Sequence, residues 1–306
     1  MSEPSSQRRR DWTILEVLGW TTQRFAERGL ASPRLDAELL IAHALGAKRI
    51  ELYTRSTDLL TAEQLTQIRE VVRRRQEGES VAYITGEKEF WGLPFKVNAN
   101  VLVPRPDTET LVEAALERLP KDEARRVLDV GTGSGAIAIS VAKARPLAQV
   151  VAIDKHEAAL VVAQENAARN QVSVSFLQGD LLAPLADKAE PQPFDLILAN
   201  LPYIPTADIA ALAPEVRREP LSALDGGADG LDLIRTLLSQ APAWLCPGGM
   251  VLLELGQGQA GSVAELCEKA GFTSPFVLKD LAGIERVVGA VHGEPQPPPT
   301  TSATSE

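Results

Sequence analysis

The sequence predicts an open α/β fold, in which a mostly parallel sheet carries helices on both faces, preceded by a small helical domain. From residue 105 onward, short apolar segments with strand character alternate with stretches of helical apolar spacing, which is typical of βαβ units. From Trp12 to about Gly78 the apolar residues recur three and four positions apart, which indicates amphipathic helices. Strands are predicted over residues 126–130, 150–154, 172–177, 194–199, 250–254, 276–278 and 287–291.

The helical domain contains signals for where its helices begin and end. Ser32 followed by Pro33 suits an N-cap with proline at the first helical position. Thr61, with Gln64 three residues later, fits a capping box. Gly78 is expected to end the last helix of this domain.

Residues 89–97 place aromatic and β-branched side chains around a glycine and a proline, which predicts a β-hairpin connector. The expected organisation is a disordered tail over 1–10, a helical domain over 11–86, a β-hairpin linker over 87–104, the α/β domain over 105–292 and a disordered tail over 293–306.

The composition disfavours several classes of protein. The chain lacks an apolar run of the roughly 18 residues that a membrane span requires and an apolar N-terminal secretory signal, so a cytoplasmic protein is expected. A net charge of −10 disfavours a protein whose main task is to grip nucleic acid backbones. Cys246 and Cys267 are far apart and the three histidines have no metal-ligand spacing, so neither a disulfide scaffold nor a metal is expected.

A glycine-rich turn follows the first strand of the α/β domain. It consists of Gly131, Thr132, Gly133, Ser134 and Gly135 and leads into a helix. Such a turn lets the backbone approach a ligand at the positive end of a helix. Asp154, at the end of the second strand, lies where it could bind the hydroxyls of a ribose, although it could also cap the next helix. These residues predict a nucleoside site, with a plain structural turn as the alternative.

The same turn satisfies the loose GxGxxA pattern, so a nicotinamide cofactor must be weighed against S-adenosylmethionine. Asp129 favours the latter, because a carboxylate at the strand tip would repel a pyrophosphate but suit the ammonium of a methionine moiety. The site is also expected to lack a neighbouring Arg or Lys that could bind phosphates. Asp180 and Leu181, after the third strand, could hold the adenine amino group and ring, or could form a simple loop.

The fourth strand leads directly into Asn200, Leu201, Pro202 and Tyr203. The carboxyl ends of strands in such sheets border one crevice, so this tetrapeptide should face the glycine turn. An Asn carbonyl oxygen and a free backbone carbonyl can accept both hydrogens of an NH2 group, while an aromatic ring covers its planar face. The sequence therefore predicts methyl transfer to a planar nitrogen, with an ordinary turn as the alternative.

Segments outside the α/β core resemble the release-factor glutamine methyltransferases, called PrmC or HemK. The resemblance covers nearly the whole chain except the tails and is carried by residues 83–86, 89–95, 101–109 and 223–232 together with the glycine turn. It implies a seven-stranded, Rossmann-like class I methyltransferase domain with an N-terminal helical-bundle domain that recognises the substrate. It also implies N5-methylation of the glutamine in the Gly-Gly-Gln motif of peptide chain release factors. A monomer is expected.

By the same resemblance, S-adenosylmethionine would be held by Gly131 to Gly135 and Asp154, with Asp180, Leu181 and Asn200 completing its pocket. Asn200 to Tyr203 would hold the glutamine amide.

The chain departs from the family's usual Asn-Pro-Pro-Tyr at Leu201. A backbone carbonyl is the role expected there, which Leu can fill with a looser φ than Pro imposes. Asn-Leu-Pro-Tyr also looks like the motif of ribosomal RNA adenine dimethyltransferases, so an adenine N6-methyltransferase acting on RNA or DNA is the alternative function. A third hypothesis is a non-catalytic nucleotide-binding module.

Overall fold

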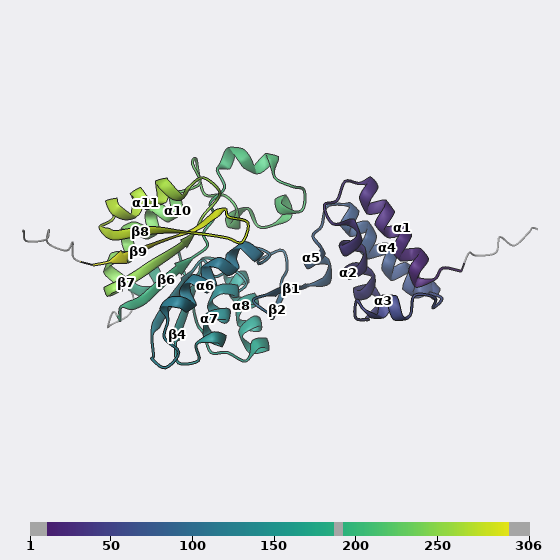
Figure 1. The fold of residues 1–306 in the computed structure, drawn as a ribbon, viewed down its shortest axis with the longest axis horizontal. Coiled ribbons are helices and arrows are strands. Elements are labelled where there is room, and N and C mark those ends of the chain that lie inside the picture. Colours follow the sequence, from purple (N-terminus) through teal and green to yellow (C-terminus); the bar gives the residue numbers. More distant parts are fainter. Residues whose placement is uncertain (1–10, 187–191, 294–306) are drawn as a thin grey trace, which may run out of the picture. The chain divides into compact units, whose positions relative to one another are not determined.

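The computed structural model describes residues 11–186 and 192–293 (Figure 1). The chain divides into two compact units. The helical unit comprises the chain up to Gly86 together with Ala213–Arg218, and the sheet unit comprises the remainder. The tails expected over residues 1–10 and 293–306 lie outside the described residues, apart from residue 293.

The helical unit contains α1 (Ile14–Glu27), α2 (Pro33–Leu45), α3 (Glu51–Thr54), α4 (Ala62–Gln76) and α5 (Val81–Thr85). Fully buried side chains such as Leu18, Phe25, Leu40 and Ile41 form its core, because the apolar stripes of α1 and α2 face each other. The helical interpretation of this region is confirmed.

The helix boundaries are mostly as the sequence predicts. Thr61 and Gln64 form the expected capping box, in which the Gln64 backbone N–H donates to the Thr61 hydroxyl at 3.2 Å. Ser32 is the N-cap before Pro33, but its side chain makes no capping hydrogen bond. The prediction that Gly78 ends the last helix is wrong. Gly78 follows α4, but one further short helix, α5, ends at the left-handed Gly86.

Residues 213–218 lie within the helical unit although they are far from it in sequence. The guanidinium of Arg75, in α4, binds Asp36 of α2 at 2.8 Å and Glu215 of this segment at 3.5 Å. Because Arg75 and Asp36 are buried, their charges stabilise each other where water cannot. The sequence gives no local signal for this long-range arrangement.

The sheet unit contains a seven-stranded sheet in the order β5-β4-β3-β6-β7-β9-β8. Its strands are β3 (Arg126–Val130), β4 (Gln149–Asp154), β5 (Ser175–Gln178), β6 (Phe194–Ala199), β7 (Leu245–Glu254), β8 (Phe272–Lys279) and β9 (Glu285–His292). The strands β5, β4, β3, β6 and β7 run parallel to one another. At one edge of the sheet, β9 pairs antiparallel with β7, and β8 pairs antiparallel with β9. The α/β prediction with a mostly parallel sheet is confirmed.

Three strand predictions are misplaced at their start: β7 begins at Leu245 and β8 at Phe272, before the predicted residues 250 and 276, and β5 begins later than predicted. Residues 172–174 do not belong to β5, because the chain first closes the preceding helix: Gln171 adopts the left-handed conformation and the Val172 N–H donates to the Ala167 carbonyl.

Helices cover both faces of the sheet (Figure 1). On one face lie α6 (Glu109–Arg118), α7 (Ala136–Ala144) and α8 (Glu157–Asn170), and on the other α10 (Asp232–Gln240) and α11 (Ala260–Lys269). Successive strand residues serve opposite faces: Val127 packs with α6 and α7, whereas Leu128 packs in the cluster with α10 and α11. This is why the parallel strands are apolar at nearly every position.

The hairpin of β1 (Glu87–Phe90) and β2 (Leu93–Lys96) is part of the sheet unit. Trp91 and Gly92 both have positive φ, as a two-residue turn that matches the twist of a hairpin requires. The buried side chain of Asn166, in α8, accepts a hydrogen bond from the Lys96 N–H at 2.6 Å and donates to the Lys96 and Ser134 carbonyls. The hairpin is thereby fixed to the glycine-rich turn.

Candidate active site

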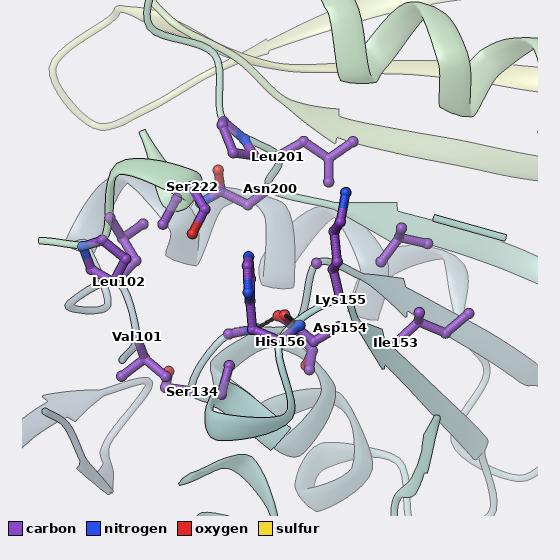
Figure 2. A pocket seen from close by; sticks show the side chains of 18 of the residues that line it. Val101, Leu102, Ser134, Ile153, Asp154, Lys155, His156, Asn200, Leu201 and Ser222 are labelled. Atoms are coloured by element: carbon purple, nitrogen blue, oxygen red, sulfur yellow. Dashed lines mark hydrogen bonds between the residues drawn. The ribbon is translucent and has the colours of Figure 1, made fainter. Parts of the chain in front are cut away.

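A cavity of about 310 Å³ opens at the carboxyl ends of β3, β4 and β6 (Figure 2). In Figure 2, Asn200 and Ser222 lie across the cavity from Ser134 and Asp154. Ligands of open α/β sheets bind at this edge, and small-molecule sites have volumes of roughly 300–1,000 Å³. The glycine turn and the acceptor tetrapeptide therefore meet in one site, as the strand pattern predicts.

The three glycines of the turn all have positive φ but serve different ends. A β-carbon on Gly131 would lie 2.9 Å from Cδ2 of Leu201, and one on Gly135 would lie 2.7 Å from Cδ1 of Ile139. A β-carbon on Gly133 would meet nothing within 4 Å. The missing side chain at Gly131 thus leaves room for the acceptor loop, and the one at Gly135 leaves room for the following helix. Gly133 lines the cavity and leaves open space beside it.

Asp129 lies beneath the turn and does not line the cavity. Its Oδ2 accepts hydrogen bonds from the Thr132 hydroxyl at 2.6 Å and from the Ala138 N–H at 3.2 Å. Its Oδ1 is buried and has no partner in the described part of the chain. Burial raises the pKa of this carboxyl to about 6. The structure thus gives Asp129 a role in holding the turn, and its expected contact with a methionine ammonium stays a prediction.

Asp154 lines the cavity and joins the turn to the next loop. Its Oδ2 accepts from the Gly133 N–H at 2.8 Å and its Oδ1 from the His156 N–H at 2.9 Å. His156, and not Asp154, is the N-cap residue of α8, so the capping alternative is wrong. Each carboxylate oxygen retains a second lone pair, with which it could accept a ribose hydroxyl.

Asp180 and Leu181 both line the cavity, Leu181 as a buried side chain with a φ of 48°. The expectation that no Arg or Lys adjoins the site is wrong, because Arg105 and Lys155 also line the cavity. Arg105 forms an ion pair with the buried Glu219, whereas Lys155 binds Asp180 at 3.0 Å in an exposed pair.

The acceptor tetrapeptide is only partly exposed to the cavity. Asn200, Leu201 and Pro202 line it, whereas Tyr203 is not among the lining residues. The Asn200 side-chain Nδ2 donates to the Thr108 hydroxyl at 3.1 Å. Burial raises the pKa of Tyr203 to about 12, so its hydroxyl stays protonated near neutral pH. Whether the ring covers an acceptor stays a prediction.

Two further glycines bring the chain after the acceptor loop against it. A β-carbon on Gly226 would lie 2.6 Å from the Pro202 carbonyl oxygen, and one on Gly230 would lie 2.2 Å from the Tyr203 carbonyl oxygen. The Ile204 carbonyl accepts a hydrogen bond from the Gly226 N–H at 2.9 Å. The glycines of the segment 223–232 thus allow this segment to pack directly against the backbone of the acceptor loop.

Sequence reasoning missed several lining residues, among them Leu102, Pro104, Arg105, Thr108, His156 and Ser222. The first four belong to the stretch 101–109, which the family resemblance singles out without assigning it a role. The buried Glu219 holds this stretch in place by accepting from the Val103 N–H at 3.0 Å and by pairing with Arg105. The stretch 101–109 is separated in sequence from the glycine turn, so the sequence alone does not show that it lines the same cavity.

In the described segments of the chain, no three His, Cys, Asp or Glu side chains form a group that could hold a metal ion. None of the helices described there is long and apolar enough to cross a membrane.

Two family models match the chain. The PrmC N-terminal domain matches residues 16–86, and the methyltransferase small domain matches residues 107–216. A solved structure of a Thermus thermophilus 16S rRNA N2 methyltransferase in complex with AdoMet and guanosine resembles the chain with a TM-score of 0.50 and 23% identity, covering 67% of this chain and 49% of that one. This likeness shows the methyltransferase fold.

Close relatives cover almost the entire chain. A protein from Geobacter sulfurreducens, named release factor glutamine methyltransferase, is 48% identical over 279 residues, which is 91% of this chain and 96% of the relative. A protein of the same name from Rhodopirellula baltica is 44% identical over 286 residues, covering 90% of this chain and 95% of the relative. The chain therefore belongs to the release factor glutamine methyltransferase family and is an S-adenosylmethionine-dependent methyltransferase.

Proposed function

We propose that this enzyme transfers a methyl group from S-adenosylmethionine to the side-chain amide nitrogen, N5, of the glutamine in the Gly-Gly-Gln motif of peptide chain release factors. The observation that carries the proposal is the meeting of Asn200 to Pro202 with the glycine turn in one cavity. The names of the relatives support a release factor as the acceptor.

The cavity residues fit S-adenosylmethionine. The open space at Gly133 accommodates a ligand beside the turn, and the carboxylate of Asp154 can accept the ribose hydroxyls. Asp180, Leu181 and Asn200 complete the lining on the other strand ends. When bound, S-adenosylmethionine supplies a methyl group that its positive sulfonium has already activated. Arg105 and Lys155, which line the described cavity, are both paired to carboxylates.

The acceptor chemistry requires positioning and no nucleophilic side chain. In the proposal, the Asn200 carbonyl oxygen and the Leu201 backbone carbonyl accept the two amide hydrogens of the glutamine, and Pro202 and Tyr203 hold the planar group. This would direct the nitrogen lone pair at the methyl group; S-adenosylhomocysteine would be the leaving group, and the methylated nitrogen would lose one of its two protons to water. Orientation of two reactants can lower a barrier by roughly 7 to 11 kcal/mol, so placement by Asn200 to Tyr203 is sufficient in principle.

The decisive experiment incubates the protein with methyl-labelled S-adenosylmethionine and a release factor, followed by peptide mass spectrometry. We expect one methyl group on the Gly-Gly-Gln glutamine. Asn200→Ala should abolish turnover while cofactor binding is retained, because Asn200 orients the acceptor. Labelling of RNA or DNA adenine under conditions where the release factor stays unlabelled would refute the proposal in favour of the adenine methyltransferase.

In this proposal the helical unit recognises the release factor, and the enzyme acts as a cytoplasmic monomer without a metal. The helical unit presents exposed apolar side chains that could contact a protein, including Trp20, Ile50 and Leu59. The net charge of −10 argues against direct binding of nucleic acid as its main task.

A further inference from the structure

Glu254 is a buried glutamate that the mechanism above does not use. It is the last residue of β7 and only 2% exposed. Leu253 pairs with Ala199 across the parallel strands β7 and β6. Glu254 and Asn200 are the next residues along these strands, so the fold places the carboxyl group beside the acceptor asparagine at the same edge of the sheet.

A short chain of polar groups joins Glu254 to the cavity. The Asn200 Nδ2 donates to the Thr108 hydroxyl oxygen at 3.1 Å, and the side chains of Thr108 and Asn200 lie close enough to the Glu254 carboxyl to lower its pKa. Asn200 and Thr108 line the cavity, whereas Glu254 does not. One carboxyl oxygen, Oε2, is buried and lacks a hydrogen-bond partner within the described residues. Burying a polar oxygen without a hydrogen-bond partner costs folding free energy, so a functional role for Glu254 would explain why the chain has it.

An asparagine amide has a donor end and an acceptor end, whereas an ionised carboxylate only accepts. A carboxylate behind Asn200 therefore selects the orientation in which the NH2 group faces Thr108 and Glu254. The carbonyl oxygen Oδ1 is then turned away from the carboxylate. We propose that ionised Glu254 is a positioning residue, which holds Asn200 through Thr108 so that Oδ1 is presented to the acceptor NH2 group. This rests on the proposed function, in which Asn200 accepts a hydrogen from the glutamine amide.

Glu254 gains or loses its proton near neutral pH. Burial, and to a lesser extent the nearby Asp107, raise its pKa, whereas hydrogen bonds from Thr108 and Asn200 and the charge of Arg286 lower it, leaving a pKa of about 7. Arg286 is itself paired with Asp107 at 2.8 Å and Asp280 at 2.9 Å.

Tyr203, the other titratable group near Glu254, stays neutral because its pKa is raised. A protonated Glu254 can donate a hydrogen bond and so tolerates the opposite orientation of Asn200. Turnover should therefore fall as the pH falls through about 7, since the orienting charge is lost.

The test compares the full-length protein with Glu254→Gln, which keeps the shape and removes the charge. We expect Glu254→Gln to lower kcat about tenfold at pH 8, as loss of one charge-assisted hydrogen bond would, and to flatten the acid limb of the kcat–pH profile. Its dissociation constant for S-adenosylmethionine should match that of the wild type, and so should its thermal unfolding midpoint at pH 4.5, where the wild-type Glu254 is protonated in the folded chain. Glu254→Asp, which restores a carboxylate, should recover an acid limb.

Thr108→Val removes the hydroxyl between the two groups. It should also lower kcat, and combining it with Glu254→Gln should lower kcat by less than the product of the single effects. The control is Glu165→Gln, the same chemical change at an exposed position of α8, which should leave kcat and its pH profile unchanged.

An unchanged kcat and acid limb in Glu254→Gln would overturn the proposal. So would a loss of cofactor affinity or of the unfolding midpoint in proportion to kcat, because Glu254 would then be merely structural. If the protein methylates a different acceptor, the proposed function fails. The ratio of Glu254→Gln to wild-type turnover on that acceptor then still tests the positioning role.

Discussion

At the scale of single residues, three carboxyl groups near the cavity have different roles because their surroundings differ. Asp154 borders the cavity with both oxygens engaged by backbone N–H groups, Asp129 supports the turn from below, and Glu254 lies behind Asn200. Burial raises the pKa of Asp129 and Glu254. A buried carboxyl can thus support a site without touching the ligand.

Asp154→Asn should weaken the binding of S-adenosylmethionine about tenfold or more, because an amide NH2 group would replace an oxygen that now accepts from Gly133 or His156. Isothermal titration calorimetry gives the dissociation constant directly. The control is Asp122→Asn, at an exposed position remote from the cavity lining, which should bind as the wild type does. An unaltered constant in Asp154→Asn would show that the ribose assignment is wrong.

At the scale of elements, the glycine turn and the acceptor loop are fitted to each other. Leu201, which stands where the family usually has proline, is 4% exposed, and its Cδ2 reaches the space that a β-carbon on Gly131 would occupy. Leu201 therefore packs against the cofactor turn in addition to any role of its backbone carbonyl. The departure from the family motif is accommodated by the absence of a side chain at Gly131.

Gly131→Ala should lower the free energy of unfolding more than Gly258→Ala does. Both glycines have positive φ, which costs an L residue roughly 1–2 kcal/mol, but only Gly131 has Leu201 within 3 Å of the new β-carbon. Urea unfolding measures both effects. In a Leu201→Ala background the excess cost at Gly131 should disappear. If it persists there, the clash with Leu201 is not its cause.

At the scale of the whole molecule, Glu254 links stability to pH. Its folded-state pKa of about 7 lies above its ordinary value of 4.5, so the folded chain binds this proton more tightly than the unfolded chain. The stability contributed by the protonated form is therefore fully present below about pH 4.5 and is lost as the pH rises through about 7. Asp129, with a pKa raised to about 6, acts in the same direction.

Relative to the wild type, Glu254→Gln should therefore gain stability as the pH rises from below 4.5 to above 7. The expected gain is on the order of 3 kcal/mol, at about 1.4 kcal/mol per pKa unit. The difference between the two proteins removes the contributions of all other titrating groups. Urea unfolding at pH 4.5 and at pH 8 measures it. A difference that is independent of pH would show that folding does not shift the ionisation of Glu254.

The sequence by itself determined the elements and the strand-end motifs. Apolar periodicity and capping are local, so α1, α4 and the strands from β3 to β9 could be located from residues that are neighbours in the chain. The starts of β5, β7 and β8 were misplaced, and α5 was missed. Because parallel strands align their carboxyl ends, the meeting of Gly131 with Asn200 also followed from the order of elements. The family resemblance narrowed the acceptor further, to a glutamine amide.

Only the tertiary structure decided which side chains surround that meeting point. Thr108 contacts Asn200 across 92 positions of sequence, and Glu219 pairs with Arg105 across 114. No local period or motif encodes such contacts, because they depend on how strand edges and loops are brought together by packing. For the same reason only the structure shows that Asp129 lies beneath the turn and that Glu254 lies behind Asn200 at the end of a neighbouring strand.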